Sequence, residues 1–407
     1  MRYQKGLGNS SDLFARRTMM DKWTVVDMFC GVGGLAHGFV KEGFRLAAGI
    51  DIDESCGYPF EHNNGAPFIR RDVQSLTSSE LATLFGSSRH RILVGCAPCQ
   101  PFSKYTSAQT EDSKWHLLRS FLRLIIQVLP EVISMENVAE LQKHVIFHDF
   151  VEALEEHGYE VTESVVETWR YGVPQTRKRL VLLGSRLGRI CLPPPTHGES
   201  RKRTVRRVIG NLEKISAGET SPSDPLHRAR ALSSLNLKRI RNTPEGGDWR
   251  NWPLSLRLKC HKKASGKRYE AIYGRMSWDR LAPTLTTHCG GIGNGRFGHP
   301  EQDRAISLRE AALLQTFPKY YELYDPATRL SSKRLSKHIG NAVPVRLGRI
   351  IARAIRQHLE ITDGGCHERQ ERAIYIRDFL ECSESLRESV SQLRDGTWGS
   401  HFKFVGR

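Results

Sequence analysis

The first half of the chain alternates short apolar runs with helical patterns, and this alternation restricts the folds open to it. Each run spans a few residues and is flanked by turn residues, which is typical of buried strands. The predicted strands cover 24–29, 46–50, 91–95, 131–135, 159–168 and 179–184, and the predicted helices 35–41, 55–62, 79–85 and 115–129. This order predicts an α/β fold: a doubly wound, mostly parallel sheet with helices on both faces and its last two strands antiparallel at one edge.

Glycines and carboxylates follow these strands where the chain leaves the sheet. Gly31, Gly33 and Gly34 lie between the first strand and its helix, where a tight turn exposes unpaired helix N–H groups. Asp51 ends the next strand, twenty positions after Gly31, at the spacing of ribose-binding carboxylates in nucleotide-binding sheets. Asp72 follows on the same edge, although an exposed loop aspartate would give the same signal. The pattern predicts a nucleotide-like cofactor and suits a nicotinamide cofactor equally well.

Cys96 and Cys99 form a C-x-x-C pair in the loop after the strand 91–95. Zinc would need two more ligands, and no other Cys–His pair has metal-type spacing. A redox site would have no use for the sequence Gln-Pro-Phe-Ser that follows Cys99. Nine cysteines, an odd number at irregular spacing, form no disulfide framework and favour a reducing compartment. The pair is therefore interpreted as a nucleophilic Cys99 with Cys96 as apolar packing, and no metal is expected.

A nucleophile needs partners, and two neighbouring stretches supply them. Glu136 follows the strand 131–135 on the same sheet edge, where burial would raise its proton affinity and allow it to donate a proton. Arg177 and Arg179 alternate on an extended chain, so we expect both to face one anion or carbonyl. Alone, Glu136 would also suit a helix cap and Arg179 a charged strand entry.

One segment carries most of the positive charge. The chain has a formal net charge of +17, of which +14 lies between residues 186 and 280, where 22 Lys and Arg face eight Asp and Glu. Such a block predicts binding to a polyanion, most simply nucleic acid. The alternative, a solvated linker, is disfavoured by three Trp and two Tyr between 249 and 278. The sequence shows neither a membrane span nor a secretory signal.

Taken together, the motifs resemble the DNA (cytosine-5)-methyltransferase family from about residue 24 to 359. D-M-F-C-G-V-G-G resembles its methyl-donor loop, G-C-A-P-C-Q-P-F-S its Pro-Cys nucleophile loop, and M-E-N-V its Glu-Asn-Val motif. P-Q-T-R-K-R-L is similar to its Gln-x-Arg-x-Arg motif. A-P-T-L-T-T and R-E-A-A-L-L-Q-T-F-P follow, and H-I-G-N-A-V-P resembles its closing motif. Any one of these is weak, but all of them in the family's order are specific.

The resemblance implies an S-adenosylmethionine-dependent enzyme that methylates carbon 5 of a cytosine flipped out of double-stranded DNA. Cys99 would add to carbon 6, Glu136 would hold or protonate N3, and Arg177 and Arg179 would steady the base and the loop. The implied cofactor contacts are Phe29, Gly31, Gly33, Gly34, Asp51, Ile52, Asp72, Val73, Pro98, Asn341, Ala342 and Val343. The implied DNA contacts are Gln100, Ser103, Gln175 and basic residues such as Arg250, Lys262 and Arg268.

The resemblance also implies an organisation for the chain. We expect a tail at 1–22, a catalytic and cofactor-binding domain at 23–185, a basic target-recognition domain at 186–280, a return to the catalytic domain at 281–361 and an extension at 362–407. The compact size indicates a bacterial, cytoplasmic and nucleoid-associated monomer, functionally paired with a restriction endonuclease. Two positions depart from the family pattern: Asp51 stands where many members have glutamate, and Ile52 where some have an aromatic residue.

Three other functions stay open on the sequence alone. An RNA cytosine methyltransferase shares the catalytic motifs, although the long basic region favours DNA. A non-catalytic DNA-binding regulator is disfavoured because Cys99, Glu136, Gln175, Arg177 and Arg179 are all present. A nicotinamide oxidoreductase explains only the Gly31 to Asp51 region.

Overall fold

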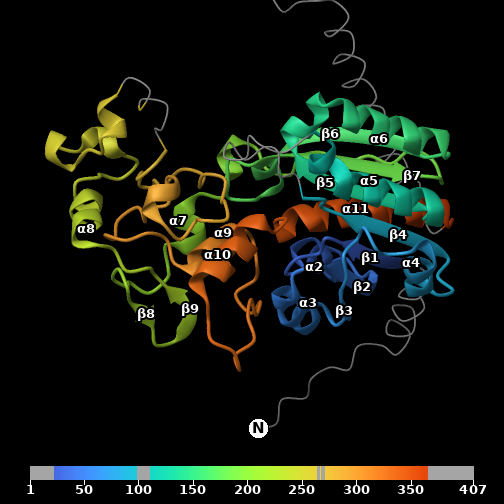
Figure 1. Ribbon diagram of the computed structural model, residues 1–407, viewed down its shortest axis with the longest axis horizontal. Helices are drawn as coiled ribbons and strands as arrows, with labels where there is room; N and C mark the ends of the chain where they lie inside the picture. Colours follow the sequence, from blue (N-terminus) through green and yellow to red (C-terminus); the bar gives the residue numbers. More distant parts are fainter. Residues whose placement is uncertain (1–22, 99–110, 264–265, 267–270, 365–407) are drawn as a thin grey trace, which may run out of the picture.

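The computed structural model describes residues 23–98, 111–263, 266 and 271–364, and Figure 1 shows them in two lobes. One lobe contains a seven-stranded sheet with helices on both faces, and the other is largely irregular. The long helix α11 (Val345–Thr362) returns the chain to the sheet lobe. No helix in the described part of the chain combines the length and hydropathy of a membrane span.

The sheet has the strand order β3-β2-β1-β4-β5-β7-β6. Its strands are β1 (Trp23–Met28), β2 (Arg45–Asp51), β3 (Phe68–Arg70), β4 (His90–Gly95), β5 (Val132–Val138), β6 (Glu160–Glu167) and β7 (Lys178–Ser185). Strands β1 to β5 pair in parallel, and β7 lies antiparallel between β5 and β6. The predicted fold class and the antiparallel pair are confirmed. The three-residue β3 was not predicted, because so short a run shows no periodicity.

Helices cover both faces of this sheet, as predicted. They are α2 (Gly34–Lys41), α3 (Gly57–Asn64), α4 (Ser78–Phe85), α5 (Glu111–Val128) and α6 (Val145–Glu156), and the 3-10 turn η1 (Glu54–Cys56) precedes α3. Apolar residues of α2 and α11 form one core with the sheet, and those of α4, α5 and α6 form a second core on the opposite face. The carboxyl ends of the parallel strands therefore stay uncovered by these layers. Helix α6 was not among the predicted elements.

The second lobe is held mainly by one large apolar cluster, beside a smaller one around Ile240, and its described residues form only a two-stranded sheet. Its regular elements are α7 (Val205–Ile209), β8 (Thr220–Ser221), β9 (Asp224–Arg228), α8 (Ser234–Arg241), α9 (Leu308–Leu314) and α10 (Ser332–Asn341). The cluster joins side chains of α7 and β9 to those of α9 and α10. Packing thus continues across residue 280, where the sequence predicts a domain boundary, because the helices that cover α7 come from later in the chain. The boundaries themselves stay a prediction.

Candidate active site

The loop after β1 has an unusual backbone. Phe29 has φ +58°, a conformation that costs a non-glycine residue free energy and is found most often at functional sites. Gly33 has φ +82° and is the N-cap of α2. The N–H of Gly31 donates to Oδ2 of Asp51 at 2.9 Å, and the N–H of Asp53 donates to Oδ1 at 2.9 Å. Both oxygens of Asp51 are thereby fixed at the strand end.

The closing motif reaches this loop from the other end of the chain. A side-chain carbon on Gly34 would lie 2.3 Å from the carbonyl oxygen of Val343, so only glycine fits there. Gln315 Nε2 donates to the carbonyl of Ala342, which anchors the segment, and Asn341 is exposed beside it. The structure therefore brings the predicted loop and the predicted closing residues into direct contact.

The remaining predicted cofactor contacts differ in exposure. The Ile52 side chain is 65 % exposed, which leaves a large apolar surface next to Asp51, and Pro98 is also exposed. Asp72 accepts the N–H of Gln74 at 3.0 Å and lies two residues after the end of β3. The Val73 side chain is buried in the core, so only its backbone is available.

This set of residues fits S-adenosylmethionine. Space is open around Gly31, since a β-carbon added there would meet no atom within 4 Å. The exposed Ile52 offers an apolar face to a base, and the fixed Asp51 carboxylate offers acceptors to ribose hydroxyls. The half-buried Phe29 ring, edge-on to Phe121 at 6.2 Å, lines the same loop.

Sequence reasoning missed Asp27, which is buried inside β1. Its Oδ2 accepts the N–H of Ala36 at 3.2 Å, and its Oδ1 has no hydrogen-bond partner among the described residues. Burial raises the pKa of this carboxyl well above its usual range. A carboxylate within a run of apolar strand residues was the only signal in the sequence.

Three predicted catalytic residues, Glu136, Arg177 and Arg179, lie together near the end of β5 and the start of β7. Glu136 lies opposite Val181 in the antiparallel pair, so Arg179, two residues from Val181, shares its face of the sheet. Arg179 Nε lies 3.1 Å from Glu136 Oε1, within ion-pair range. The angles between these two groups do not allow a hydrogen bond. The buried Oε1 therefore has no hydrogen-bond donor among the described residues.

Cys96, predicted as packing, also takes part in this cluster. Its Sγ donates to Glu136 Oε2 at 3.0 Å while its side chain packs against the core. Burial, with Glu136 beside it, raises the pKa of the Cys96 thiol well above its usual range, so the thiol stays protonated. Cys99, Gln100 and Ser103 lie outside the described residues, immediately beyond Pro98.

Arg177 lies deeper than Arg179. It is buried, donates from Nη1 to the carbonyl of Leu285 at 3.3 Å, and has an Nε without a hydrogen-bond partner in the described part of the chain. Burial, and then the nearby Arg179, lower the pKa of its guanidinium. A buried cation with an unused donor beside Glu136 is suited to an anionic or carbonyl group.

Comparison with known proteins decides between the open functions. The family model of the C-5 cytosine-specific DNA methylases matches residues 23–357. The chain belongs to this family. It is 51 % identical over 355 residues to the type II methylase M.HgiDII of Herpetosiphon aurantiacus, covering 86 % of this chain and 99 % of the relative. It is 31 % identical over 341 residues to the type II methyltransferase M1.HphI of Haemophilus parahaemolyticus, covering 82 % and 86 %.

Solved structures show the same fold. An E. coli protein described as a prophage-encoded DNA modification methyltransferase matches with a TM-score of 0.64 and 20 % identity, over 83 % of this chain and all of that one. A DNMT2 mutant of Spodoptera frugiperda matches with a TM-score of 0.57 and 15 % identity, over 82 % of this chain and all of that one. With the family match, the chain is a DNA (cytosine-5)-methyltransferase of the restriction–modification type, as its motifs predicted.

In this methyltransferase, the predicted DNA contact Gln175 lies in the interior. Its Nε2 donates to the carbonyl of Leu314 at 2.9 Å and to Gln315 Oε1 at 2.6 Å, and its Oε1 accepts the N–H of Leu285 at 3.0 Å. The amide thus joins the Arg177 loop to the second lobe. These contacts support a structural role and give a DNA contact no support.

The basic segment of the methyltransferase uses part of its charge internally. Arg250, predicted to contact DNA, pairs with Asp248 through Nε at 2.9 Å and Nη2 at 2.7 Å. Lys262 is exposed, and Arg268 lies outside the described residues. A stack of Trp249 on His261, with ring centroids 4.3 Å apart, forms the centre of this region.

Proposed function

We propose that this enzyme transfers the methyl group of S-adenosylmethionine to carbon 5 of a flipped-out cytosine in a specific duplex sequence, through a covalent Cys99 adduct. The observation that carries the proposal is the cluster of the buried Glu136 and Arg177 with the partly buried Cys96 and Arg179 at the strand ends. Cys99 is the residue that directly follows the described Pro98, three positions after Cys96.

The proposed steps follow from these residues. The Cys99 thiolate forms a bond to carbon 6, and Glu136 supplies a proton at N3, so that the ring's electron pair becomes available at carbon 5. S-adenosylmethionine supplies the methyl group that carbon 5 receives. Loss of the carbon-5 proton to a base in solution then expels the Cys99 thiolate, N3 returns its proton to Glu136, and the aromatic ring is restored. The guanidinium groups of Arg177 and Arg179 hold the base and balance the charge that develops on it.

The cofactor would lie along the loop after β1. Phe29, Gly31 and Gly33 would contact the methionine part of the cofactor. Asp51 and Ile52 would contact its ribose and adenine, and Asp72 would contact the adenine amine. Gly34 with Asn341 to Val343 would close that pocket. The fixed Asp51 carboxylate and the exposed Ile52 support this assignment.

Covalent trapping tests the role of Cys99. In duplex DNA that carries 5-fluorocytosine, fluorine cannot leave as a cation, so an adduct at carbon 6 persists after denaturation. We expect wild type with S-adenosylmethionine to form this denaturation-stable complex and to transfer labelled methyl groups, and Cys99→Ser to do neither. Equal labelling of duplex DNA by both proteins would exclude the assignment, and transfer to tRNA instead of plasmid would favour the RNA enzyme.

The biological role belongs to the same proposal. Type II relatives motivate pairing with a restriction endonuclease whose cleavage the methyl group blocks, by a monomeric enzyme at the nucleoid of a bacterial cytoplasm. Bisulfite sequencing of plasmid from an expressing strain would identify the methylated sequence. Plasmid whose cytosines are all converted by bisulfite would contradict the role.

A further inference from the structure

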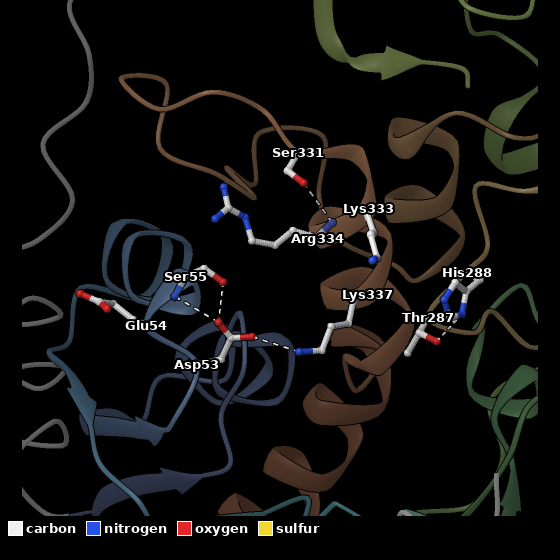
Figure 2. A pocket seen from close by; sticks show the side chains of 9 residues that line it. All are labelled: Asp53, Glu54, Ser55, Thr287, His288, Ser331, Lys333, Arg334 and Lys337. Carbon is white, nitrogen blue, oxygen red and sulfur yellow. Dashed lines mark hydrogen bonds and ion pairs between the residues drawn. The ribbon is translucent and has the colours of Figure 1, made fainter. Parts of the chain in front are cut away.

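A cavity of about 840 Å³ lies between the turn η1, the helix α10 and the loop at Thr287. Figure 2 shows three cations of α10, Lys333, Arg334 and Lys337, reaching toward it from one side, with Asp53 and Glu54 on the other. Hydroxyl groups of Thr287 and Ser331 complete its rim. None of the residues assigned above to chemistry or to the cofactor lines this cavity, and its cations lie outside the basic segment 186–280.

Its acidic side chains are already neutralised. Asp53 accepts from Ser55 and from Lys337 Nζ at 3.3 Å, and Glu54 pairs with Arg70 at 2.8 Å. By contrast, Lys333 and Arg334 are exposed and no carboxylate of the described residues pairs with either. The cavity therefore presents two uncompensated positive charges beside hydroxyl donors, which matches the chemistry of phosphate oxygens.

The cavity also lies close to the catalytic cluster. Arg177 donates to the carbonyl of Leu285, and Thr287 is only two residues further along. An extended chain covers about 3.5 Å per residue, so Thr287 is within about 7 Å of Leu285. A side-chain carbon on Gly340 would lie 2.3 Å from Thr286, which fixes this segment against α10. A duplex whose target base reaches Glu136 and Arg177 carries a phosphate charge about every 1.7 Å of its axis, so phosphates that flank this base are available to a site this close.

We propose that this cavity binds backbone phosphates of the duplex flanking the target cytosine, as a second anchor separate from the basic segment. This rests on the proposed function above. Lys333 and Arg334 contact phosphate oxygens as charges, and Thr287 and Ser331 donate hydrogen bonds to them. Such contacts set the position and orientation of the duplex without reading its sequence.

The double variant Lys333→Ala/Arg334→Ala tests the anchor. Removing two phosphate contacts reduces the slope of log affinity against log salt by about two, since each contact contributes about 0.9. We therefore expect a several-fold higher KM for long duplexes at low salt, an unchanged KM for S-adenosylmethionine and an unchanged recognised sequence. On duplexes with progressively shorter flanks, the variant and wild type converge.

Lys41→Ala, at the far end of α2 and beside Tyr320, is the matched control and keeps the wild-type slope. An unchanged slope in the double variant overturns the anchor, and so does a change confined to the KM for S-adenosylmethionine, which would assign the cavity to the cofactor. If wild type methylates no duplex at all, the proposed function fails first, which is a separate result.

A second inference rests on the contact between Cys96 and Glu136. Because Oε2 accepts the Cys96 thiol at 3.0 Å, the other oxygen, Oε1, has its ion pair with Arg179 at 3.1 Å but no hydrogen bond among the described residues. We infer that Cys96 is a positioning residue that fixes Glu136 in one orientation and presents Oε1 to the target base. The thiol donates to Oε2 a hydrogen bond that a water molecule would otherwise compete to make in this site.

Comparison of Cys96→Ala with Cys96→Ser tests this role. We expect Cys96→Ala to lower kcat about tenfold with little change in the KM for DNA, because the interaction acts on the positioned acid. Cys96→Ser keeps a donor of similar size and restores kcat to within about threefold of wild type. A wild-type kcat in Cys96→Ala overturns the inference. Equal loss in both variants, with matching thermal stability, does so as well.

Discussion

The carboxyl edge of the sheet and the basic segment 186–280 use charge in opposite ways. At the sheet edge, a few charged groups lie at strand ends and are held in fixed positions, as Asp51 is by two N–H groups and Glu136 by Cys96. In the basic segment, several arginines stabilise an irregular chain. Arg275 is 4 % exposed and donates to the carbonyls of Thr243 and Ile240.

The difference has a physical cause. A sheet satisfies its own carbonyl groups, whereas an irregular lobe leaves many of them without ladder partners. Arginine, with five donors in a planar fork, can satisfy several at once and stack on aromatic rings. Arg275 donates to several carbonyls. Arg239 donates from Nε to the carbonyl of Leu256 at 3.0 Å and has its guanidinium 5.4 Å from the Trp252 ring. The net charge of this segment therefore overstates the charge that is available to a partner molecule.

The largest effect is expected at the sheet edge. Glu136→Gln keeps the size of the side chain and removes its acid, and we expect kcat to fall about 10²- to 10⁴-fold, the usual contribution of a general acid. The melting temperature should change little. Single-turnover methylation of a short duplex measures the rate, and a rate within about threefold of wild type would show that Glu136 does not transfer a proton.

Arg275→Met should destabilise the second lobe without a direct effect on DNA binding. It leaves several buried carbonyls and the partner Asp303 without a donor, so we expect a loss of about 3 kcal/mol in the free energy of unfolding. Denaturant unfolding measures this. If stability holds and the salt dependence of DNA binding falls instead, Arg275 belongs to the DNA-binding surface and the comparison fails.

Gly34→Ala tests the contact between the two ends of the sheet lobe. The added carbon would lie 2.3 Å from the Val343 carbonyl oxygen, so the closing segment must shift, at a cost of about 1–3 kcal/mol. We expect weaker S-adenosylmethionine binding in calorimetry, without a change in the salt dependence of DNA binding. Gly198→Ala, where the added carbon meets no atom within 4 Å and φ is −87°, controls for the loss of a glycine.

The smallest effect is expected for Lys262→Ala. This side chain is exposed and carries no ion pair within the described residues, so folding stability should stay the same. We expect the salt slope of DNA binding to fall by about one, the contribution of one phosphate contact. An unchanged slope would show that Lys262 does not contact DNA phosphates, and that still less of the segment's charge is available to DNA.

The sequence was informative where chemistry coincides with strand ends. Gly31, Asp51 and Glu136 could be placed on one edge because parallel strands end together, and the structure brings them there. The pairing of β7 with β5, which sets Arg179 beside Glu136, depends on an antiparallel register that strand patterns do not encode.

The second lobe was hardest to predict. Its core joins β9 and α7 to the distant α9 and α10, and such contacts leave no local periodicity. The hydrogen bond from Cys96 was missed for a similar reason, since it links residues forty positions apart on neighbouring strands. The residue type of Cys96 indicated packing, and only the register of β4 and β5 shows that its thiol is a hydrogen-bond donor to Glu136.

The contact of Gly34 with Val343 has a consequence for biosynthesis. The loop after β1 leaves the ribosome early, but the segment that contacts it and the helix α11 that packs on α2 follow roughly 300 residues later. Chains lengthen N-terminus first, and domains fold as units. A nascent chain therefore carries this loop without its cover until Val343 has been translated, and no fragment that ends before Val343 contains both sides of the contact.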